Sequence, residues 1–211
     1  GIGPSKAKTL VEVQQVTSVD DLRTRQDELL NSKQIIGLRY QDDISRRIPR
    51  REIDKHNIFL QKVIRDIDRR ATVTIVGSYL RNHPDSGDID VLITHPDNDI
   101  NVYRRFISRL GKVGYITELL AYGDKKFMGL AKLPRHKYHR RIDVLYTPIE
   151  EYPFALLYFT GSGRFNTAVR KIATKQGYRL SEHGIRYIDP DTRKATTPVD
   201  MIFRTEQEIF Y

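Results

Sequence analysis

Two hydrophobic runs joined by a short polar turn constrain the fold of this chain more than any other segment. The run 72–76 is apolar and largely β-branched, which predicts a buried strand. Gly77 and Ser78 end that run and can open a short helix, whose free backbone N–H groups suit a phosphate. The next run begins with Asp88 and Asp90, and residues i and i+2 of a strand point to one face. The segment therefore predicts a phosphate-binding turn beside a pair of carboxylates.

The carboxylate pair points to a metal. Adjacent carboxylates repel each other unless a cation lies between them, and Mg²⁺ is the usual candidate. A third acid, Asp143, stands between two aliphatic residues in another strand-like run, where it is costly unless paired or metal-bound. If the strands are neighbours, Asp88, Asp90 and Asp143 form a two-metal site for phosphoryl transfer. Two plainer interpretations stay open: D-x-D is often only an exposed strand edge, and Asp143 can pair with Arg141.

Composition sets broad limits. The 211 residues are 39% hydrophobic and 30% charged, which is typical of soluble globular proteins. No apolar run approaches the roughly 18 residues of a membrane span, so we expect no membrane partner. The absence of cysteine excludes disulfides and thiolate metal sites. The net charge of +9 favours an anionic partner.

The hydrophobic period divides the chain near Arg70–Ala71, with helical patterns before it and strands after it. A long amphipathic helix opens at Pro49, with Ile53, Ile58 and Leu60 among its apolar positions. The other expected elements are helices over 18–30, 32–44, 102–110, 150–159 and 165–176, a hairpin of 115–122 with 126–133, a β-ribbon over 178–187 and a helix start at 205–208.

Five motifs in order carry a family resemblance. G-S-Y-L-R, S-G-D-I-D-V-L-I-T-H-P, K-F-M-G, R-R-I-D-V and Y-F-T-G-S resemble the family X DNA polymerases, nearest to the polymerase-beta type, over almost the whole chain. The resemblance implies an α+β fold with a nucleotidyltransferase palm on a mixed or antiparallel sheet. It implies a helical DNA-binding subdomain with a partial helix-hairpin-helix over 1–46, the palm over 47–148 and an α/β nucleotide-selection subdomain over 149–211. No lyase domain is recognisable, and a chain lacking an initiator Met is expected to be a fragment or processed form.

The resemblance also assigns roles. Asp88 and Asp90 bridge two Mg²⁺ ions, for which Mn²⁺ can substitute, and Asp143 holds only the catalytic one. A Na⁺ or K⁺ ion is expected on the carbonyl of Ile2, although G-I-G-P alone reads as an ordinary loop. The nucleotide-binding residues are Arg47, Gly77, Ser78, Arg81, Ser86, Gly87, Tyr158, Phe159, Gly161 and Asn166. The DNA-binding residues are Gly1, Gly3, Ser5, Lys6, Lys126, Arg141 and Arg170.

The implied activity is template-directed addition of dNTPs to a primer 3′-OH on gapped or nicked DNA, in repair gap filling such as base excision repair. The short connection over 134–139 and the Tyr158–Phe159 pair favour template dependence and deoxynucleotides. Three residues depart from the polymerase-beta pattern: Gly163, Leu145 and His183.

We expect a monomer, nuclear if eukaryotic and otherwise cytoplasmic or viral. Two other functions stay open. One is a template-independent nucleotidyltransferase, and the other is a catalytically weak module that binds DNA gaps.

Overall fold

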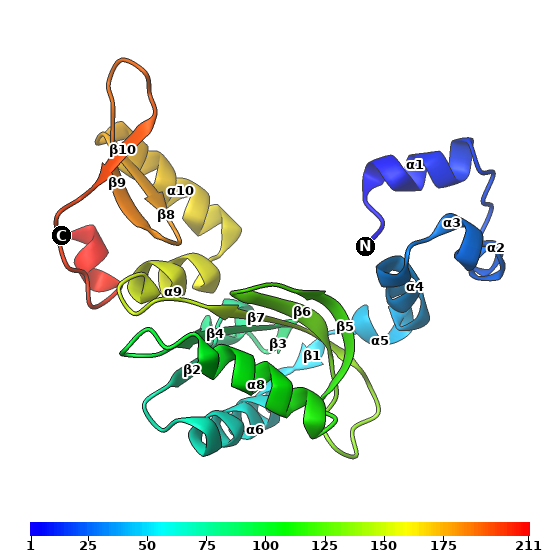
Figure 1. Ribbon diagram of the computed structural model, residues 1–211. Coiled ribbons are helices and arrows are strands. Elements are labelled where there is room, and N and C mark those ends of the chain that lie inside the picture. Colours follow the sequence, from blue (N-terminus) through cyan, green and yellow to red (C-terminus); the bar gives the residue numbers. More distant parts are fainter. The chain divides into compact units, whose positions relative to one another are not determined.

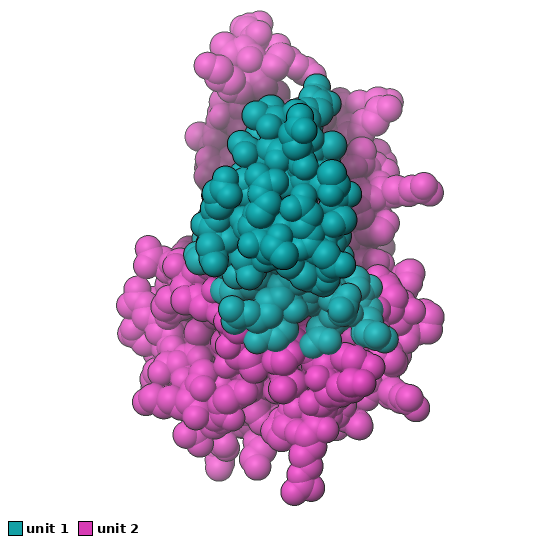
Figure 2. Space-filling model, turned by 90° about the vertical axis from the view of Figure 1, so that its right-hand side faces the viewer, with its two compact units in different colours: residues 1–46 teal, residues 47–211 magenta.

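The computed structural model describes all residues, 1–211, in two compact units of 1–46 and 47–211 (Figures 1 and 2). The first unit is helical: α1 (Pro4–Glu12), α2 (Val19–Thr24), α3 (Gln26–Leu29), α4 (Ser32–Arg39) and α5 (Gln41–Ile44). Its small core consists of leucines, namely Leu10, Leu22, Leu29, Leu30 and Leu38. No helix in either unit is both long and apolar enough to cross a bilayer.

Two predicted helices of the first unit are each broken in two. The helix predicted over 18–30 is interrupted at Arg25, whose ψ of 15° leaves the helical region and whose side chain donates to the Gln14 carbonyl at 3.0 Å. The helix predicted over 32–44 breaks in the same way at Tyr40. The predicted start at Ser18 is confirmed, because its hydroxyl accepts a hydrogen bond from the Asp21 N–H.

The second unit is built on a five-stranded sheet in the order β2-β4-β7-β6-β5. The strands are β2 (Thr72–Ile75), β4 (Ile89–Thr94), β5 (Ile116–Tyr122), β6 (Lys126–Ala131) and β7 (Arg140–Tyr146). Only the β4–β7 pair is parallel. The predicted hairpin therefore forms as β5 and β6, and the predicted α+β class with a mixed sheet is confirmed.

Helices α6 (Arg50–Ile67) and α8 (Asn101–Lys112) cover one face of this sheet (Figure 1). Both are amphipathic, and their apolar faces share one core with the alternate strand residues that include Val91 and Val144. The boundary predicted near Arg70–Ala71 is wrong, because α6 packs in the same core as the sheet. Ile58, predicted among the apolar positions, is 71% exposed on the outer side of α6.

The opposite face of the sheet carries helix α9 (Tyr152–Thr160). Val76 and Leu92 pack there against Ala155, with Leu145 and Phe159 at the margin. Since residues alternate along a strand, Asp90 and Asp143 lie on this α9 side and not on the α6 side.

The rest of the second unit follows α9. Helix α10 (Gly163–Lys175) begins two residues earlier than predicted and packs on a three-stranded sheet of β8 (Tyr178–Ser181), β9 (Gly184–Ile188) and β10 (Ala195–Pro198). The sequence predicted the first two of these strands and missed β10. The helix start predicted at 205–208 is a short 3-10 turn, η1 (Gln207–Phe210).

A small ladder pairs β1 (Ile48–Pro49) with β3 (Asp85–Ser86), and α7 (Gly77–Leu80) is one turn long.

A buried polar network ties α6 to the start of β7. Arg140, only 3% exposed, donates to both carboxylate oxygens of Glu52 at 2.8 and 2.9 Å. His56 Nδ1 lies 2.7 Å from the Tyr115 hydroxyl, beside the same carboxylate. Burial raises the pKa of Glu52, but the nearby His56 and the hydrogen bonds from Arg140 outweigh it and lower the pKa to about 2. The network therefore holds a buried charge pair under the strand that carries Asp143.

Replacing Glu52 by Gln should destabilise the second unit strongly. Removing one partner of a buried ion pair leaves the other charge uncompensated, which costs about 3 kcal/mol or more. Urea unfolding followed by circular dichroism measures this. The matched control is Asp97→Asn, which removes an exposed pair with Arg70 and should cost less than about 1 kcal/mol. Equal losses in the two variants would show that the network carries no special share of stability.

Candidate functional site

The parallel pairing of β4 with β7 brings the predicted acids together. Asp90 and Asp143 are direct partners in the ladder, and Asp88 precedes β4 at the same end. Asp90 and Asp143 are half-buried, on the side of the sheet that carries α9. Two segments far apart in sequence thus contribute three carboxylates to one acidic cluster, as the sequence predicted.

Arg141 lies among these carboxylates. Its Nη2 is 3.2 Å from Asp143 Oδ2 and 3.6 Å from Asp88 Oδ2. The pair of Asp143 with Arg141 that the sequence left open is therefore present. With the side chains in these positions, no three acidic or histidine residues converge on a point that would hold a metal ion. The donor chemistry nevertheless suits a hard cation, since all three groups are oxygen ligands close to one another.

Burial and mutual repulsion favour the protonated form of this cluster. Burial, and then the charges of Asp88 and Asp143, raises the pKa of Asp90 to about 7. Burial also raises the pKa of Asp143, against the lowering effect of Arg141 and Lys126. A cation bound among these carboxylates would favour their ionised forms, which burial and mutual repulsion disfavour.

The turn after β2 approaches the acids closely. Gly77 has a φ of +65°, and a Cβ on it would lie 2.8 Å from Asp90 Oδ2, so only glycine fits there. The first N–H groups of the one-turn helix α7 have no partner within that helix. The Ser78 hydroxyl donates to the Ser86 hydroxyl at 2.7 Å. Since Ser86 is buried, it supports Ser78 and does not itself line the cleft.

An open cleft of about 490 Å³ runs beside the acids. It collects most of the residues predicted to bind the nucleotide, together with His83, Ser162 and Gly163, which were not predicted. Its predicted lining residues are Arg47, Gly77, Ser78, Arg81, Gly87, Asp88, Asp90, Tyr158, Phe159, Gly161 and Asn166. Two arginines and a set of backbone and hydroxyl donors thus face a cleft with acids at one side.

Each cleft arginine is held by a neighbour. Arg47 donates to one Asp85 carboxylate oxygen through Nε at 3.0 Å and Nη2 at 2.6 Å, and also to the Asp85 carbonyl. Arg81 donates to the Thr160 carbonyl at 2.5 Å. Asp85 was not among the predicted site residues, although an acid directly before Ser86 and Gly87 could have indicated a partner for one of the predicted arginines. These contacts fix both guanidinium groups at the cleft wall.

The break after α9 sets the far wall of the cleft. Gly161 has a φ of +67°, and the Gly161–Ser162 peptide is cis. The Asn166 amide donates to the Tyr158 carbonyl at 2.7 Å, while the Thr160 carbonyl accepts from Arg81. The Phe159 carbonyl accepts no such hydrogen bond. The last turn of α9 therefore leaves one free acceptor beside the cleft.

The two aromatic residues of this turn have different surroundings. Phe159 packs with the apolar cluster under α9. The Tyr158 ring lies edge-on to Phe159, and the Arg170 guanidinium stands 4.7 Å from its centre. Arg170 also pairs with Glu182 at 3.3 Å. The departing residue His183 contacts Glu151 with Nδ1 at 2.8 Å, outside the cleft.

The other departures have local explanations. Leu145 packs on the α9 side of the sheet, where it contributes to the apolar cluster. Gly163 opens α10 at the cleft, and a Cβ there would meet nothing within 4 Å. Lys126, which was predicted to bind DNA, lines a small cavity together with Asp90 and Asp143.

The residues predicted to touch DNA in the first unit lie at the start of α1. Gly3 is its N-cap, and Ser5 and Lys6 lie in the first turn. The Gly1 carbonyl accepts from Gln34 Nε2 at 3.2 Å, and the Gly3 carbonyl from the Ala7 N–H. The Ile2 carbonyl accepts neither kind of bond, which leaves it open to a ligand.

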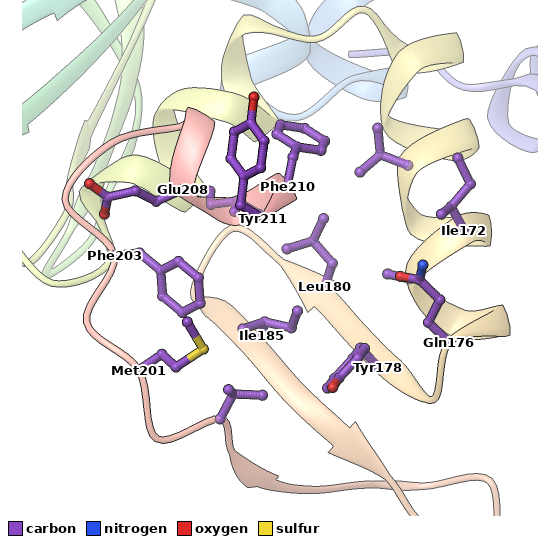
Figure 3. Close-up of a pocket in the computed structure, with 14 residues that line it drawn as sticks. Ile172, Gln176, Tyr178, Leu180, Ile185, Met201, Phe203, Glu208, Phe210 and Tyr211 are labelled. Atoms are coloured by element: carbon purple, nitrogen blue, oxygen red, sulfur yellow. The ribbon is translucent and has the colours of Figure 1, made fainter.

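A second hollow of about 360 Å³ lies near the C-terminus (Figure 3). Its walls come from α10, β8, β9 and the last residues of the chain, and they are mostly aliphatic and aromatic, as Ile172, Met201 and Phe203 illustrate. It holds no predicted site residue and no cation, so the polar cleft is the candidate site.

Comparisons with known proteins agree with this architecture. Family models match in three consecutive segments: the fingers domain of DNA polymerase lambda over 1–45, the DNA polymerase beta palm over 47–149 and the DNA polymerase beta thumb over 155–211. The chain belongs to the family X DNA polymerases, and the resemblance read from its motifs is confirmed. Polymerases of this family use divalent metal ions.

Curated relatives carry polymerase names. The chain is 30% identical to DNA polymerase lambda of Arabidopsis thaliana over 225 residues, which is 100% of this chain and 42% of that protein. It is 33% identical to DNA polymerase lambda of Rattus norvegicus, over 80% of the chain and 30% of the relative. It is 27% identical to the DNA-directed DNA/RNA polymerase mu of Homo sapiens, over 83% and 42%. The chain thus spans less than half the length of these relatives.

The acidic cluster predicts a pH-dependent gain in stability for Asp90→Asn without added metal. A carboxyl whose pKa is raised on folding destabilises the fold as pH rises from its unfolded value of 3.8 through about 7. Removing that charge should therefore raise the melting temperature at pH 8 and leave it nearly unchanged at pH 4. Differential scanning calorimetry in a chelating buffer measures both. The exposed Asp124→Asn is the control, and an equal effect at both pH values would contradict the assigned burial.

Proposed function

We propose that this chain is the polymerase portion of a template-directed DNA polymerase, which adds dNTPs to a primer 3′-OH on gapped or nicked DNA. The observation that carries the proposal is the ladder pairing of Asp90 with Asp143, with Asp88 at the same end, beside a cleft that holds Arg47 and Arg81. Carboxylates next to phosphate-binding cations are the arrangement that phosphoryl transfer requires.

The chain's residues divide the work in this proposal. Arg47, Arg81 and Ser78 bind the oxygens of the triphosphate, through guanidinium and hydroxyl donors. Asp143, whose pKa is raised, stands at the primer end and can accept the proton of the 3′-OH. Arg141, Arg170 and Lys126 contact DNA phosphates, and Gly1, Gly3, Ser5 and Lys6 bind a strand phosphate without reading its sequence.

Asp88, Asp90 and Asp143 are the residues that would hold divalent metal. Asp88 and Asp90 would serve both of two Mg²⁺ ions, and Asp143 only one of them. When bound, these ions neutralise charge on the phosphates and lower the pKa of the attacking hydroxyl. Arg141 must leave the carboxylates for this to occur, and a DNA phosphate offers it an alternative partner. The open Ile2 carbonyl is the proposed ligand for a Na⁺ or K⁺ ion.

Selection of the sugar is assigned to the end of α9. The Tyr158 and Thr160 carbonyls are occupied by Asn166 and Arg81, so their positions are fixed. A 2′-OH placed against this rigid turn meets carbonyl oxygen at close range, and the misfit raises the barrier for a ribonucleotide. We further propose a monomer that works in repair gap filling, with a nuclear location in a eukaryotic cell.

Extension of a gapped primer tests the function directly. Each of the four dNTPs is supplied singly on templates that differ in the gap base, with Mg²⁺ present. Incorporation should follow the complementary base and need the template. Equal extension of a primer without a template would move the protein to the template-independent nucleotidyltransferases, and no extension would leave a module that only binds DNA gaps.

Asp143→Ala should lower the extension rate by at least about 1000-fold, or about 4 kcal/mol, because it removes a metal-binding carboxylate beside the 3′-OH. Single-turnover extension measures the rate, and fluorescence anisotropy measures DNA affinity, which should stay within a few-fold. The control is Asp124→Ala, an exposed acid of the same subdomain. A rate within about tenfold of the parent chain would remove Asp143 from the catalytic site.

The parent chain should prefer a matched dNTP to the rNTP by a few hundredfold, on the order of 3 kcal/mol. The measurement is kcat/KM for both nucleotides on one gapped template. Changing Tyr158→Gly together with Phe159→Trp should lower the preference, since the turn loses its packing. Tyr187→Gly, on the distant β9, is the matched control. Near-equal values for the parent chain would refute the assignment of this turn to sugar selection.

A further inference from the structure

The solvent face of α6 carries a row of cations. Arg51, Lys55, Lys62 and Arg65 are all exposed, and their spacings of four, seven and three residues place them on one stripe of a 3.6-residue helix. Ile58 is the remaining member of that stripe. We call these four basic residues the cationic stripe.

No protein group neutralises the cationic stripe. None of its four side chains makes a hydrogen bond or an ion pair, whereas the adjacent Arg50 donates to the Tyr79 carbonyl at 2.7 Å and lies over the Tyr79 ring. On the neighbouring helix α8, Arg109 and Lys112 are likewise exposed and unpaired. The exposed charges of this helical layer are therefore mainly positive, with Asp66 as the exposed acid on α6.

The cationic stripe lies on the wrong side of the sheet to serve the cleft. The opposite side of α6 packs into the core through Ile53, Leu60 and Ile64. By strand alternation, Asp90 and Asp143 lie on the other face of the sheet, which is the face that carries α9. The sheet thus separates the two surfaces, and DNA held at the acids leaves the cationic stripe uncovered.

We propose that the cationic stripe is a second binding surface for duplex DNA, without sequence preference. Four cations spread over about 21 Å of helix match the rise of about six base pairs of phosphate backbone. A lipid surface or a partner helix would need an apolar face, and the stripe offers only Ile58. A single strand would need exposed aromatic rings for its bases, and the stripe has none. The kind of ligand that remains is a regular polyanion, such as the phosphate backbone of duplex DNA.

This surface would let the chain hold a second stretch of duplex while the cleft holds a gap or primer end. Its contacts would be electrostatic, so its affinity should fall steeply with salt. The surface does not depend on catalysis, because its residues touch none of the groups assigned to the reaction.

The test compares two triple variants of the full chain that lose the same charge. The stripe variant is Lys55→Gln, Lys62→Gln and Arg65→Gln, which keeps good helix formers on α6. The control variant is Lys175→Gln, Arg193→Gln and Lys194→Gln, which removes three exposed cations from elsewhere in the second unit. Each protein is first saturated with unlabelled gapped DNA, and binding of a labelled duplex with closed hairpin ends is then followed by anisotropy across a NaCl series.

The parent and control proteins should bind the second duplex alike. The stripe variant should bind it at least about tenfold more weakly, with a salt slope reduced by about 2 to 3, since each lost phosphate contact removes about 0.9. Its melting temperature and its extension of the gapped primer should match the parent, which separates this surface from the cleft. Equal losses of duplex binding in the stripe and control variants would overturn the proposal. The proposal would also fail if the stripe variant bound the duplex as well as the parent but had lost binding to anionic vesicles or polyglutamate. If extension is absent in the parent but the stripe variant still loses duplex binding, the proposed function fails and the second surface stands.

Discussion

The single parallel contact in the sheet, between β4 and β7, is the constraint on which the candidate site depends. Parallel strands need a long crossover, and here α8 and the β5–β6 hairpin provide it. Helix α8 of this crossover and helix α6, which precedes β2, bury one face of the sheet, and the pleat then places Asp90 and Asp143 on the other face. A register shift of one residue in either strand would turn its carboxylate into the core, where an unpaired charge is not tolerated.

The buried ion pair between Glu52 and Arg140 holds β7, the strand that carries Asp143, to α6 on the other side of the sheet. Residues 140 and 141 are adjacent in β7 and point to opposite faces, so one arginine is locked to α6 while the next meets the acids. The position of the acidic cluster therefore depends on packing on both sides of the sheet. This dependence explains how a helix remote from the cleft contributes to the site without touching it.

The sequence allowed the strands of the five-stranded sheet, the acidic cluster and the turn at Gly77–Ser78 to be predicted, because strand alternation and a glycine after an apolar run are local signals. It did not allow the breaks at Arg25 and Tyr40 to be predicted, since the helical pattern continues through both, and the contact of Arg25 with the Gln14 carbonyl joins residues eleven positions apart. The boundary near residue 70 failed for a related reason: a change of period marks a change of element, whereas a domain is defined by which surfaces share a core. Asp85 was missed because its partner Arg47 is distant in sequence.

Arg141 gives the acidic cluster an internal counter-ion, and this has a consequence for how ligands would arrive. Its guanidinium offsets repulsion between Asp88 and Asp143, although its own Nε is buried without a partner. If the acids bind metal as proposed, each ion must first displace this arginine, and the displaced charge then becomes available to a phosphate. Metal and DNA would each favour the arrangement that the other needs, so each should raise the affinity of the chain for the other by the same factor. Such reciprocity would keep the chain from gathering ions until a substrate is present.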